Sequence, residues 1–351
     1  MTDSLTRVID LKKLRDEESY RSGVIRKGIE PELIDDVLQR EEICRKLLQE
    51  VEELRSQQNA ASKDIGRAIP EERDAKIAAA ASMKESLQSK EAEYSSAAEI
   101  LDNLTIGLPN PASERCPDGG EEDYEVIETI GDCNQAPPMN HSEYGEFMDW
   151  VETEKAAENM GSRFAYLKNE AVLLEFALVQ YIMSKLVGKG FTPVVTPVLV
   201  REEMMIDAGF FPTDRNQVYE LPKDDLFLTG TSEVALAGLH RGDLLEGNTL
   251  PARYVGYSSC FRREAGTYGK DTTGIFRVHQ FDKVEMFSFC NPEESWNELE
   301  ILRGIEQEIL NELGLPHRVI LVASEDLGAP AALKYDCEVW LPSEGQYREL
   351  T

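Results

Sequence analysis

Residues 261–287 read FRREAGTYGKDTTGIFRVHQFDKVEMF, and this stretch decides how the second half of the chain is expected to fold. Two runs that alternate like β-strands flank a loop with three glycines. Successive side chains of a strand point to opposite faces, so one face is predicted to carry Arg277, His279, Phe281, Lys283 and Glu285. If the two runs pair as a hairpin, Arg262 and Glu264 at the end of the first strand join the same concave surface.

This set of side chains suits a nucleotide. Arginine forks bind phosphates in bidentate fashion, an aromatic ring stacks on a purine, and a carboxylate accepts hydrogen bonds from an amine. The alternative is a solvated face of salt-bridged pairs, which contributes little to stability. The spacing alone leaves both interpretations open. A phosphate-binding GxxxxGK[ST] loop is excluded here, because Glu264 replaces its first glycine and Asp271 follows Lys270.

The composition restricts the class of protein. Of 351 residues, 37 are basic and 66 are acidic, which gives a net charge of -29. A polyanion partner would therefore have to meet local basic patches on an acidic body. No apolar run is expected to reach the roughly 20 residues of a membrane span. The N-terminus lacks a secretory signal, and six scattered cysteines without a CxxC pair favour a reducing cytoplasm, where we expect the protein to reside.

Residues 31–104 carry a different pattern from the rest. Apolar residues recur at spacings close to 3.5 in two runs separated by Gly66 and Pro70. The first run contains Val37, Cys44, Leu47, Val51, Leu54, Ala61 and Ile65, and the second contains Ala80, Met83, Leu87, Tyr94, Ala97, Leu101 and Leu104. This pattern predicts two long helices that fold back as an antiparallel coiled-coil hairpin. A spacer or a dimerisation element would produce the same pattern.

A linker rich in proline, glycine and acidic residues follows, and it predicts a domain boundary near Pro111. Beyond it, an apolar helix is predicted over 169–190 and another over 292–313, capped by Asn291. Strands are predicted over 191–200, 225–236, 252–261, 274–289, 317–323 and 334–342. Strands that follow one another without intervening helices indicate an α+β fold with a mainly antiparallel sheet.

The stretch from Phe261 to Glu285 closely resembles motif 2 of the seryl-tRNA synthetases, a class II aminoacyl-tRNA synthetase family. Further similar segments follow in the family's order: LPNP at 108–111, GFTPVVTPVLV at 190–200, LTGTSEV at 228–234 and YDCEVWLPSEGQYRE at 335–349. The resemblance implies an antiparallel sheet flanked by helices, with an N-terminal coiled-coil arm. It divides the chain into a tRNA-binding domain over 1–111 and a catalytic domain over 112–351.

The resemblance also implies roles for individual residues. Arg262, Glu264 and Arg277 would be catalytic. ATP would be held by Arg262, Arg263, Glu264, Arg277, Val278, Phe281 and Glu349, and Glu349 would also bind Mg²⁺. Serine would be bound by Thr231, Ser232, Glu233 and Glu285. The tRNA would be bound by Arg45, Lys46, Arg55, Lys63 and Arg67 on the arm.

The implied activity is that of a serine–tRNA ligase, which uses ATP to activate L-serine and transfers it to serine tRNA, with selenocysteine tRNA as a further acceptor. A homodimer that does not engage a membrane is implied. The family continues beyond YREL with motif 3, so a chain truncated at Thr351 is expected to lack part of the ATP site. Two alternatives are a non-catalytic tRNA-binding relative and a ligase that loads an amino acid onto a carrier protein; ligases of the latter kind lack the long arm.

Overall fold

The computed structural model describes residues 9–66, 69–133, 137, 139–265 and 274–351. The chain divides into two compact units. The first comprises Met1–Glu114 with Leu327–Ala332, and the second comprises Arg115–Asp326 with Leu333–Thr351.

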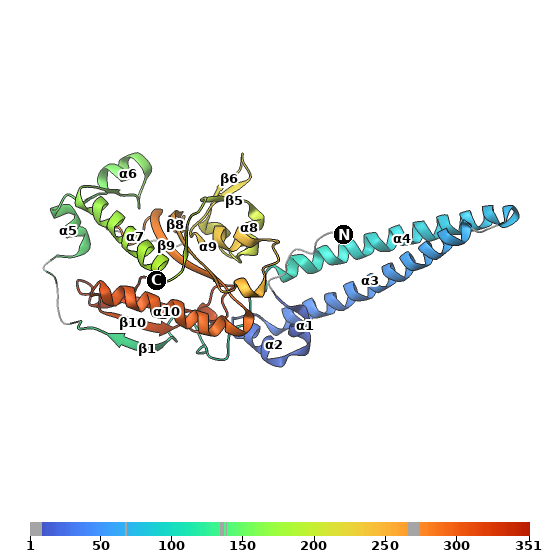
Figure 1. Cartoon of the computed structure of the whole chain (residues 1–351), viewed down its shortest axis with the longest axis horizontal. Coiled ribbons are helices and arrows are strands. Elements are labelled where there is room, and N and C mark those ends of the chain that lie inside the picture. The colour runs from blue at the N-terminus through green and yellow to red at the C-terminus, as the bar shows by residue number, and fades with distance from the viewer. Residues whose placement is uncertain (1–8, 67–68, 134–136, 138, 266–273) are drawn as a thin grey trace. The chain divides into compact units, whose positions relative to one another are not determined.

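The first unit is helical. Two short helices, α1 (Leu11–Asp16) and α2 (Glu18–Ile25), precede two long ones, α3 (Pro31–Ile65) and α4 (Pro70–Thr105), which form the hairpin seen in Figure 1. Each long helix begins with a proline, whose missing N–H costs nothing in the first turn. The predicted coiled-coil arm is thus confirmed, with helix ends within a few residues of those expected.

The predicted apolar seam lies between the two long helices. Every seam residue named from the sequence is buried or half-buried, and Val37 and Val51 are almost fully buried. At the base of the hairpin, α1 and α2 supply Leu11, Leu14 and Val24 to the same core as Ile34 and Leu101. This core is wider than a two-helix seam, and it anchors the arm within its own unit.

The second unit contains two main sheets. One has the order β1 (Glu125–Ile130), β10 (His317–Leu321), β11 (Tyr335–Leu341) and β12 (Gln346–Glu349), and all its neighbours are antiparallel. The other has the order β4 (Thr192–Val195), β8 (Ala252–Phe261) and β9 (Gln280–Phe289), in which β8 and β9 are antiparallel and β4 runs parallel to β8. The α+β fold class is confirmed.

Short elements complete the second unit. Strands β5 (Leu199–Val200), β7 (Leu226–Leu228) and β6 (Tyr219–Leu221) form a small antiparallel sheet, and β2 (Val151–Glu152) pairs with β3 (Tyr166–Leu167). The helices are α5 (His141–Phe147), α6 (Glu154–Met160), α7 (Glu170–Gly188), α8 (Glu202–Asp207), α9 (Glu233–Ala237) and α10 (Ser295–Glu312). Helices α7 and α10 share a core with the larger strands, formed by Leu186, Phe191, Val255 and Ile305.

Four of the predicted elements need correction. The strand expected over 191–200 is interrupted after Val195, and its two parts, β4 and β5, belong to different sheets. The strand expected over 274–289 begins only at Gln280, because Gly274 has a positive φ of 75° and the His279 N–H bonds to the Arg163 carbonyl instead of a neighbouring strand. The strand expected over 225–236 ends at Leu228, and the chain then turns into α9. The helix predicted from residue 292 starts with a 3₁₀ turn, and Asn291 makes no side-chain cap.

Helix α7 also corrects an expectation. It has 19 residues, and an 18-residue window within it has a mean hydropathy of 1.5, so its length and composition would suffice to cross a membrane. One such helix says little by itself, because the core helices of many proteins meet the same criterion. Leu173 and Phe176 on this helix are 68% and 59% exposed, so its apolar surface is only partly covered within this chain.

Neighbouring residues of α4 offer a test of the hairpin core. Leu101 is 2% exposed and Ile100 is 44% exposed. The variant Leu101→Ala should lower the free energy of unfolding of the hairpin by about 2–5 kcal/mol, because it leaves a cavity in a packed core. Ile100→Ala removes a similar volume from the surface and should have little effect. Urea unfolding followed by far-ultraviolet circular dichroism measures both, and equal losses would contradict the packing described above.

Candidate active site

The loop after β7 approaches the central strand closely. Residues 229–232 lead from β7 into α9, and Thr229, Thr231 and Ser232 are all buried. A glycine on β8 permits this approach, since a Cβ added at Gly256 would lie 2.9 Å from Ser232 Oγ and from Leu236 Cδ1. Gly256 is also the register partner of Glu285 on β9. The hydroxyl-bearing loop is thereby placed over the carboxylate.

Glu285 is the centre of a hydrogen-bonded cluster. Thr231 Oγ1 donates to Glu285 Oε2 over 2.5 Å, and Ser232 Oγ donates to the same oxygen over 2.7 Å. Lys283 Nζ lies 3.0 Å from Glu285 Oε1 and 3.3 Å from Thr231 Oγ1. Both oxygens of the carboxylate are therefore engaged, and the predicted serine-binding residues Thr231, Ser232 and Glu285 meet in one place.

The two carboxylates near this loop are held in different environments. Burial opposes ionisation of Glu285, but the charge of Lys283 and the two hydroxyl donors outweigh burial and lower its pKa. Glu233, at the start of α9, has its pKa raised to about 6 by burial and by the neighbouring charge of Glu285, against the opposing effect of Lys283. The site thus combines Glu285, whose lowered pKa keeps it ionised, with Glu233, whose pKa lies closer to neutral pH.

Arg262 links this cluster to the motif 2 residues. Its Nε donates to the Gly230 carbonyl over 3.3 Å, and its guanidinium carbon lies 5.1 Å from the centre of the Phe281 ring. The backbone holds it from the other side, because Arg262 N donates to the His279 carbonyl over 3.0 Å. The exposed guanidinium of Arg262 can bind an anion, and the Phe281 ring beside it can stack on a planar ring. Both groups lie next to the loop of Thr231.

Glu264 and Arg277 form the other pair of the predicted ATP site. Arg277 Nη1 lies 2.7 Å from Glu264 Oε2, and the Glu264 carboxylate is largely buried. Arg277 is not on β9, contrary to the expectation that a single strand carries Arg277, Phe281 and Glu285. It reaches Glu264 because the chain between Gly274 and His279 bends before β9 begins.

Phe276, the residue before Arg277, is contacted by two other side chains. The Phe276 ring meets the His141 ring edge-on at 5.1 Å, and the guanidinium carbon of Arg348 lies 4.8 Å from the Phe276 centre. Gly274 is required here, since a Cβ on it would come within 2.1 Å of His141 Nε2. Arg348 is adjacent to Glu349, so this contact connects β12 to the start of the Arg277 segment.

Glu349 is the carboxylate predicted to hold Mg²⁺. It lies on β12 opposite Glu338 of β11, and Lys334 Nζ is 3.5 Å from its Oε1. Among the residues that the structure describes, no group of three or more His, Cys, Asp or Glu side chains could hold a metal ion by itself. An exposed carboxylate fits Mg²⁺ nonetheless, since this ion commonly binds through one or two carboxylates together with waters and substrate phosphates.

The other predicted residues are placed as follows. Val278 lies half-buried between Arg277 and His279. Arg263 points to the neighbouring sheet, where its Nε donates to the Val218 carbonyl over 2.9 Å. On the arm, Lys46 pairs with Glu42 and Arg55 pairs with Glu91, whereas no ion pair is found for Arg45 or Lys63 among the described residues. Arg67 lies outside the described residues.

Sequence reasoning assigned no role to two contributors to this site, Lys283 and Gln217. The predicted alternation placed Lys283 on the same face as Phe281 and Glu285, but no function was inferred for it. Gln217 bonds to both the N–H and the carbonyl of Ala265, next to Glu264, and no motif in the sequence marks it.

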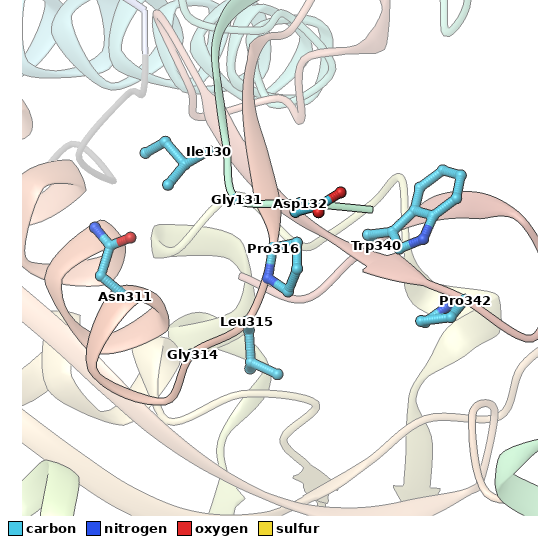
Figure 2. Close-up of a pocket in the computed structure, with 9 residues that line it drawn as sticks. All are labelled: Ile130, Gly131, Asp132, Asn311, Gly314, Leu315, Pro316, Trp340 and Pro342. Atoms are coloured by element: carbon cyan, nitrogen blue, oxygen red, sulfur yellow. The ribbon is translucent and has the colours of Figure 1, made fainter. Parts of the chain in front are cut away.

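A separate cavity of about 410 Å³ lies near the C-terminal end of α10. Its lining comes from residues 130–132, 311, 314–316, 340 and 342, which Figure 2 labels. None of the predicted site residues lines it. The candidate site around Glu285, Arg262 and Phe281 is therefore distinct from this cavity.

The raised pKa of Glu233 predicts a pH effect on stability. Its pKa is about 6 in the folded protein against an ordinary value of 4.5, so the folded state binds the proton more tightly than the unfolded state does. Protonation of Glu233 therefore stabilises the folded protein. This stabilisation is fully present below about pH 4.5 and is lost as the pH rises through about 6. Glu233→Gln should therefore gain about 1–2 kcal/mol over the parent protein near pH 7, and this gain should vanish at low pH.

Thermal unfolding of both proteins at several pH values measures this difference. Glu246→Gln, which changes an exposed glutamate, is the matched control and should show no such pH-dependent gain in stability. A constant difference between Glu233→Gln and the parent protein at all pH values would contradict the environment described for Glu233.

The chain matches known protein families over most of its length. Residues 8–112 match the seryl-tRNA synthetase N-terminal domain, and residues 217–351 match the class II tRNA synthetase core domain of the G, H, P, S and T enzymes. The chain is 44% identical over 347 residues to the serine–tRNA ligase of Thermobifida fusca, an alignment that covers 98% of this chain and 82% of the relative. It is 42% identical over 346 residues to the serine–tRNA ligase of Mycobacterium marinum, with 98% and 83% covered.

Solved structures give the same result. The seryl-tRNA synthetase of Pyrococcus horikoshii, solved in complex with ATP, superimposes with a TM-score of 0.89 at 34% identity and covers 97% of this chain and 83% of its own. The cytoplasmic serine–tRNA ligase of Naegleria fowleri, solved in complex with AMP, has a TM-score of 0.85 at 25% identity, with 97% and 84% covered. With a hydroxyl-lined carboxylate beside an arginine–aromatic pair and an N-terminal helical arm, the chain belongs to the seryl-tRNA synthetases, a family of aminoacyl-tRNA synthetases.

Proposed function

We propose that this chain activates L-serine with ATP and transfers it to serine tRNA in two steps at the site described above. In the first, a carboxylate oxygen of serine attacks the α-phosphorus of ATP, the bond to the β-phosphate oxygen breaks, and pyrophosphate leaves. In the second, a terminal ribose hydroxyl of the tRNA attacks the acyl carbon and AMP leaves. The protein supplies no nucleophile in either step, so positioning and charge neutralisation must provide the rate.

The geometry of the motif 2 residues supports the proposed ATP contacts. Arg262 is exposed and stands beside both Phe281 and the serine loop, so it can neutralise the α-phosphate while Phe281 stacks on adenine. We assign Arg277, which Glu264 holds, to the outer phosphates, and Val278 to the adenosine. Mg²⁺ bound at Glu349 would neutralise further phosphate charge. Arg263 is directed to Val218, which favours a supporting part for this residue over direct contact with ATP.

The proposed serine pocket is built on Glu285. Its buried carboxylate and that of Glu233 can receive the ammonium and hydroxyl groups of serine, and Thr231 and Ser232 orient the Glu285 carboxylate. Alanine lacks the hydroxyl and would leave a buried polar group without its partner, so a pocket of this kind rejects alanine strongly. The cluster around Glu285, next to Arg262, is the observation that carries the proposal.

Serine-dependent exchange of pyrophosphate into ATP tests the first step, and charging of serine tRNA tests the second. Selenocysteine tRNA, which we include as a proposed acceptor, is assayed in the same way. Exchange with charging of a carrier protein in place of tRNA would support the carrier-ligase alternative. Binding of tRNA without exchange would support the non-catalytic alternative, and either result would refute the proposal.

Arg262 allows a direct test of the activation step. Arg262→Gln should lower the kcat of pyrophosphate exchange by about 10²–10³, because it removes charge from the position where the transition state gains it. Arg201→Gln, which removes an exposed guanidinium at the start of α8, is the matched control and should leave exchange unchanged. Equal rates for the two variants would contradict the role of Arg262.

The arm is the proposed binding surface for serine tRNA. Lys46 and Arg55 already have carboxylate partners, so phosphates would have to compete for them, whereas Arg45 and Lys63 have no ion pair within the described part of the chain. We therefore expect Arg45 and Lys63 to contribute more than Lys46 and Arg55.

Replacing Arg45 and Lys63 with alanine should weaken tRNA binding and reduce the salt dependence of binding by about one unit of log–log slope for each tRNA phosphate that the arm no longer neutralises. Exchange of pyrophosphate, which needs no tRNA, should be unaffected. The paired residues Lys46 and Arg55 provide the comparison double variant. A larger loss of affinity from that variant would contradict the expected ranking.

We further propose that the chain works as a homodimer. Leu173 and Phe176 are exposed on one face of α7, and Val195 on β4 is 76% exposed, so the second unit has apolar surface available for a second copy. Sedimentation equilibrium measures the mass directly. Charge introduced by Leu173→Glu with Phe176→Glu should dissociate the dimer, and a parent protein that is monomeric at micromolar concentration would refute the proposal.

A further inference from the structure

Gln217 makes an unusual set of contacts at the start of the motif 2 loop. It ends a short 3₁₀ turn (Arg215–Gln217), and its side-chain amide pairs with the backbone of Ala265 in both directions. Gln217 Nε2 donates to the Ala265 carbonyl over 3.0 Å, and Ala265 N donates to Gln217 Oε1 over 2.9 Å. The Gln217 side chain thus forms the same pair of hydrogen bonds with the Ala265 backbone that a neighbouring β-strand would form.

The backbone of Gln217 holds the residue on the other side of Glu264. Arg263 N donates to the Gln217 carbonyl over 2.8 Å, and the Arg263 guanidinium carbon lies 5.0 Å from the Tyr219 ring centre. Arg263 and Ala265 are therefore both fastened to the segment that begins at Gln217. Glu264 lies between these two fixed points.

Glu264 has a backbone conformation that needs such support. Its φ is +51°, in the left-handed region that residues with a Cβ rarely adopt. Conformations of this kind persist only where the surrounding structure enforces them. With this φ, the Glu264 carboxylate is directed to Arg277, while Arg263 and Ala265 face the segment of Gln217.

We infer that Gln217 is a positioning residue for ATP recognition: its bonds to Arg263 and Ala265 hold Glu264 in the left-handed conformation from which its carboxylate orients Arg277. This inference rests on the proposed function, since it assigns ATP to the Glu264–Arg277 pair. Gln217 itself need not touch ATP. Its influence passes through Glu264, and this dependence distinguishes it from a residue that only stabilises the fold.

The test uses the isosteric variant Gln217→Met, which removes both amide bonds with little change in volume. Loss of two hydrogen bonds should raise the Kd for ATP, measured by calorimetry, about 10- to 100-fold. The KM for serine in pyrophosphate exchange should change less than about twofold, because the Glu285 cluster is untouched. Gln307→Met is the matched control, since it removes a side-chain amide bond from α10 to Glu128 and should leave both constants unchanged.

A double-mutant cycle with Glu264→Ala decides how Gln217 acts. If Gln217 works through Glu264, Gln217→Met should have almost no further effect on ATP affinity once Glu264 is gone. Full additivity in this cycle, or a Gln217→Met variant with the ATP affinity of the parent protein, would overturn the inference. Should Gln217→Met not fold, Gln217→Glu, which keeps the shape and the bond from Ala265 N–H, is compared in the same cycle.

Different results would refute the positioning role of Gln217 and the proposed function. A parent protein that binds no ATP refutes the proposed function, and with it the purpose assigned to Gln217. A parent protein that binds ATP and exchanges pyrophosphate, together with an unaffected Gln217→Met variant, refutes only the positioning role.

Discussion

At the centre of the candidate site lies a negative charge, the largely buried carboxylate of Glu285. A buried carboxylate is costly unless it is paired and hydrogen-bonded. Here the hydroxyls of Thr231 and Ser232 share one oxygen and Lys283 meets the other, so the charge is retained. This requirement explains why a glycine faces Glu285 on β8, since a side chain there would push the hydroxyl loop away.

The motif 2 residues lie next to Glu285 on β9 and at the end of β8. Phe281 and Lys283 alternate with Glu285 along β9, and Arg262 continues β8 past its last residue, which brings its guanidinium over Phe281. The described residues that follow β8 and precede β9 have separate supports. Gln217 holds the residues after β8 at Ala265, and the Phe276 contacts with His141 and Arg348 hold the residues before β9. In the proposed function, the sheet carries the groups for the amino acid, while residues distant in sequence fix the groups for the phosphates.

Local patterns in the sequence predicted much of this structure. The seam of the arm follows from residue spacing because a coiled coil depends on near neighbours, and Val37, Val51 and Leu101 are buried as expected. The alternation along β9 likewise placed Phe281 and Glu285 on one face. The bend at residues 274–279 was not predictable, because it depends on the bond from His279 to the distant Arg163 carbonyl. Gln217 escaped notice for the same reason, since its partner lies 48 residues away.

In the proposed function, one site joins the Glu285 cluster to the Arg262–Phe281 pair, with serine on one side and ATP on the other. A crystal structure of the protein with a non-hydrolysable analogue of seryl-adenylate tests this most directly. The analogue's ammonium group should lie within hydrogen-bonding distance of Glu233 or Glu285, its adenine against Phe281, and its phosphate mimic against Arg262. An analogue bound away from these residues, or one whose amino-acid portion does not contact the Glu285 cluster, would contradict the account.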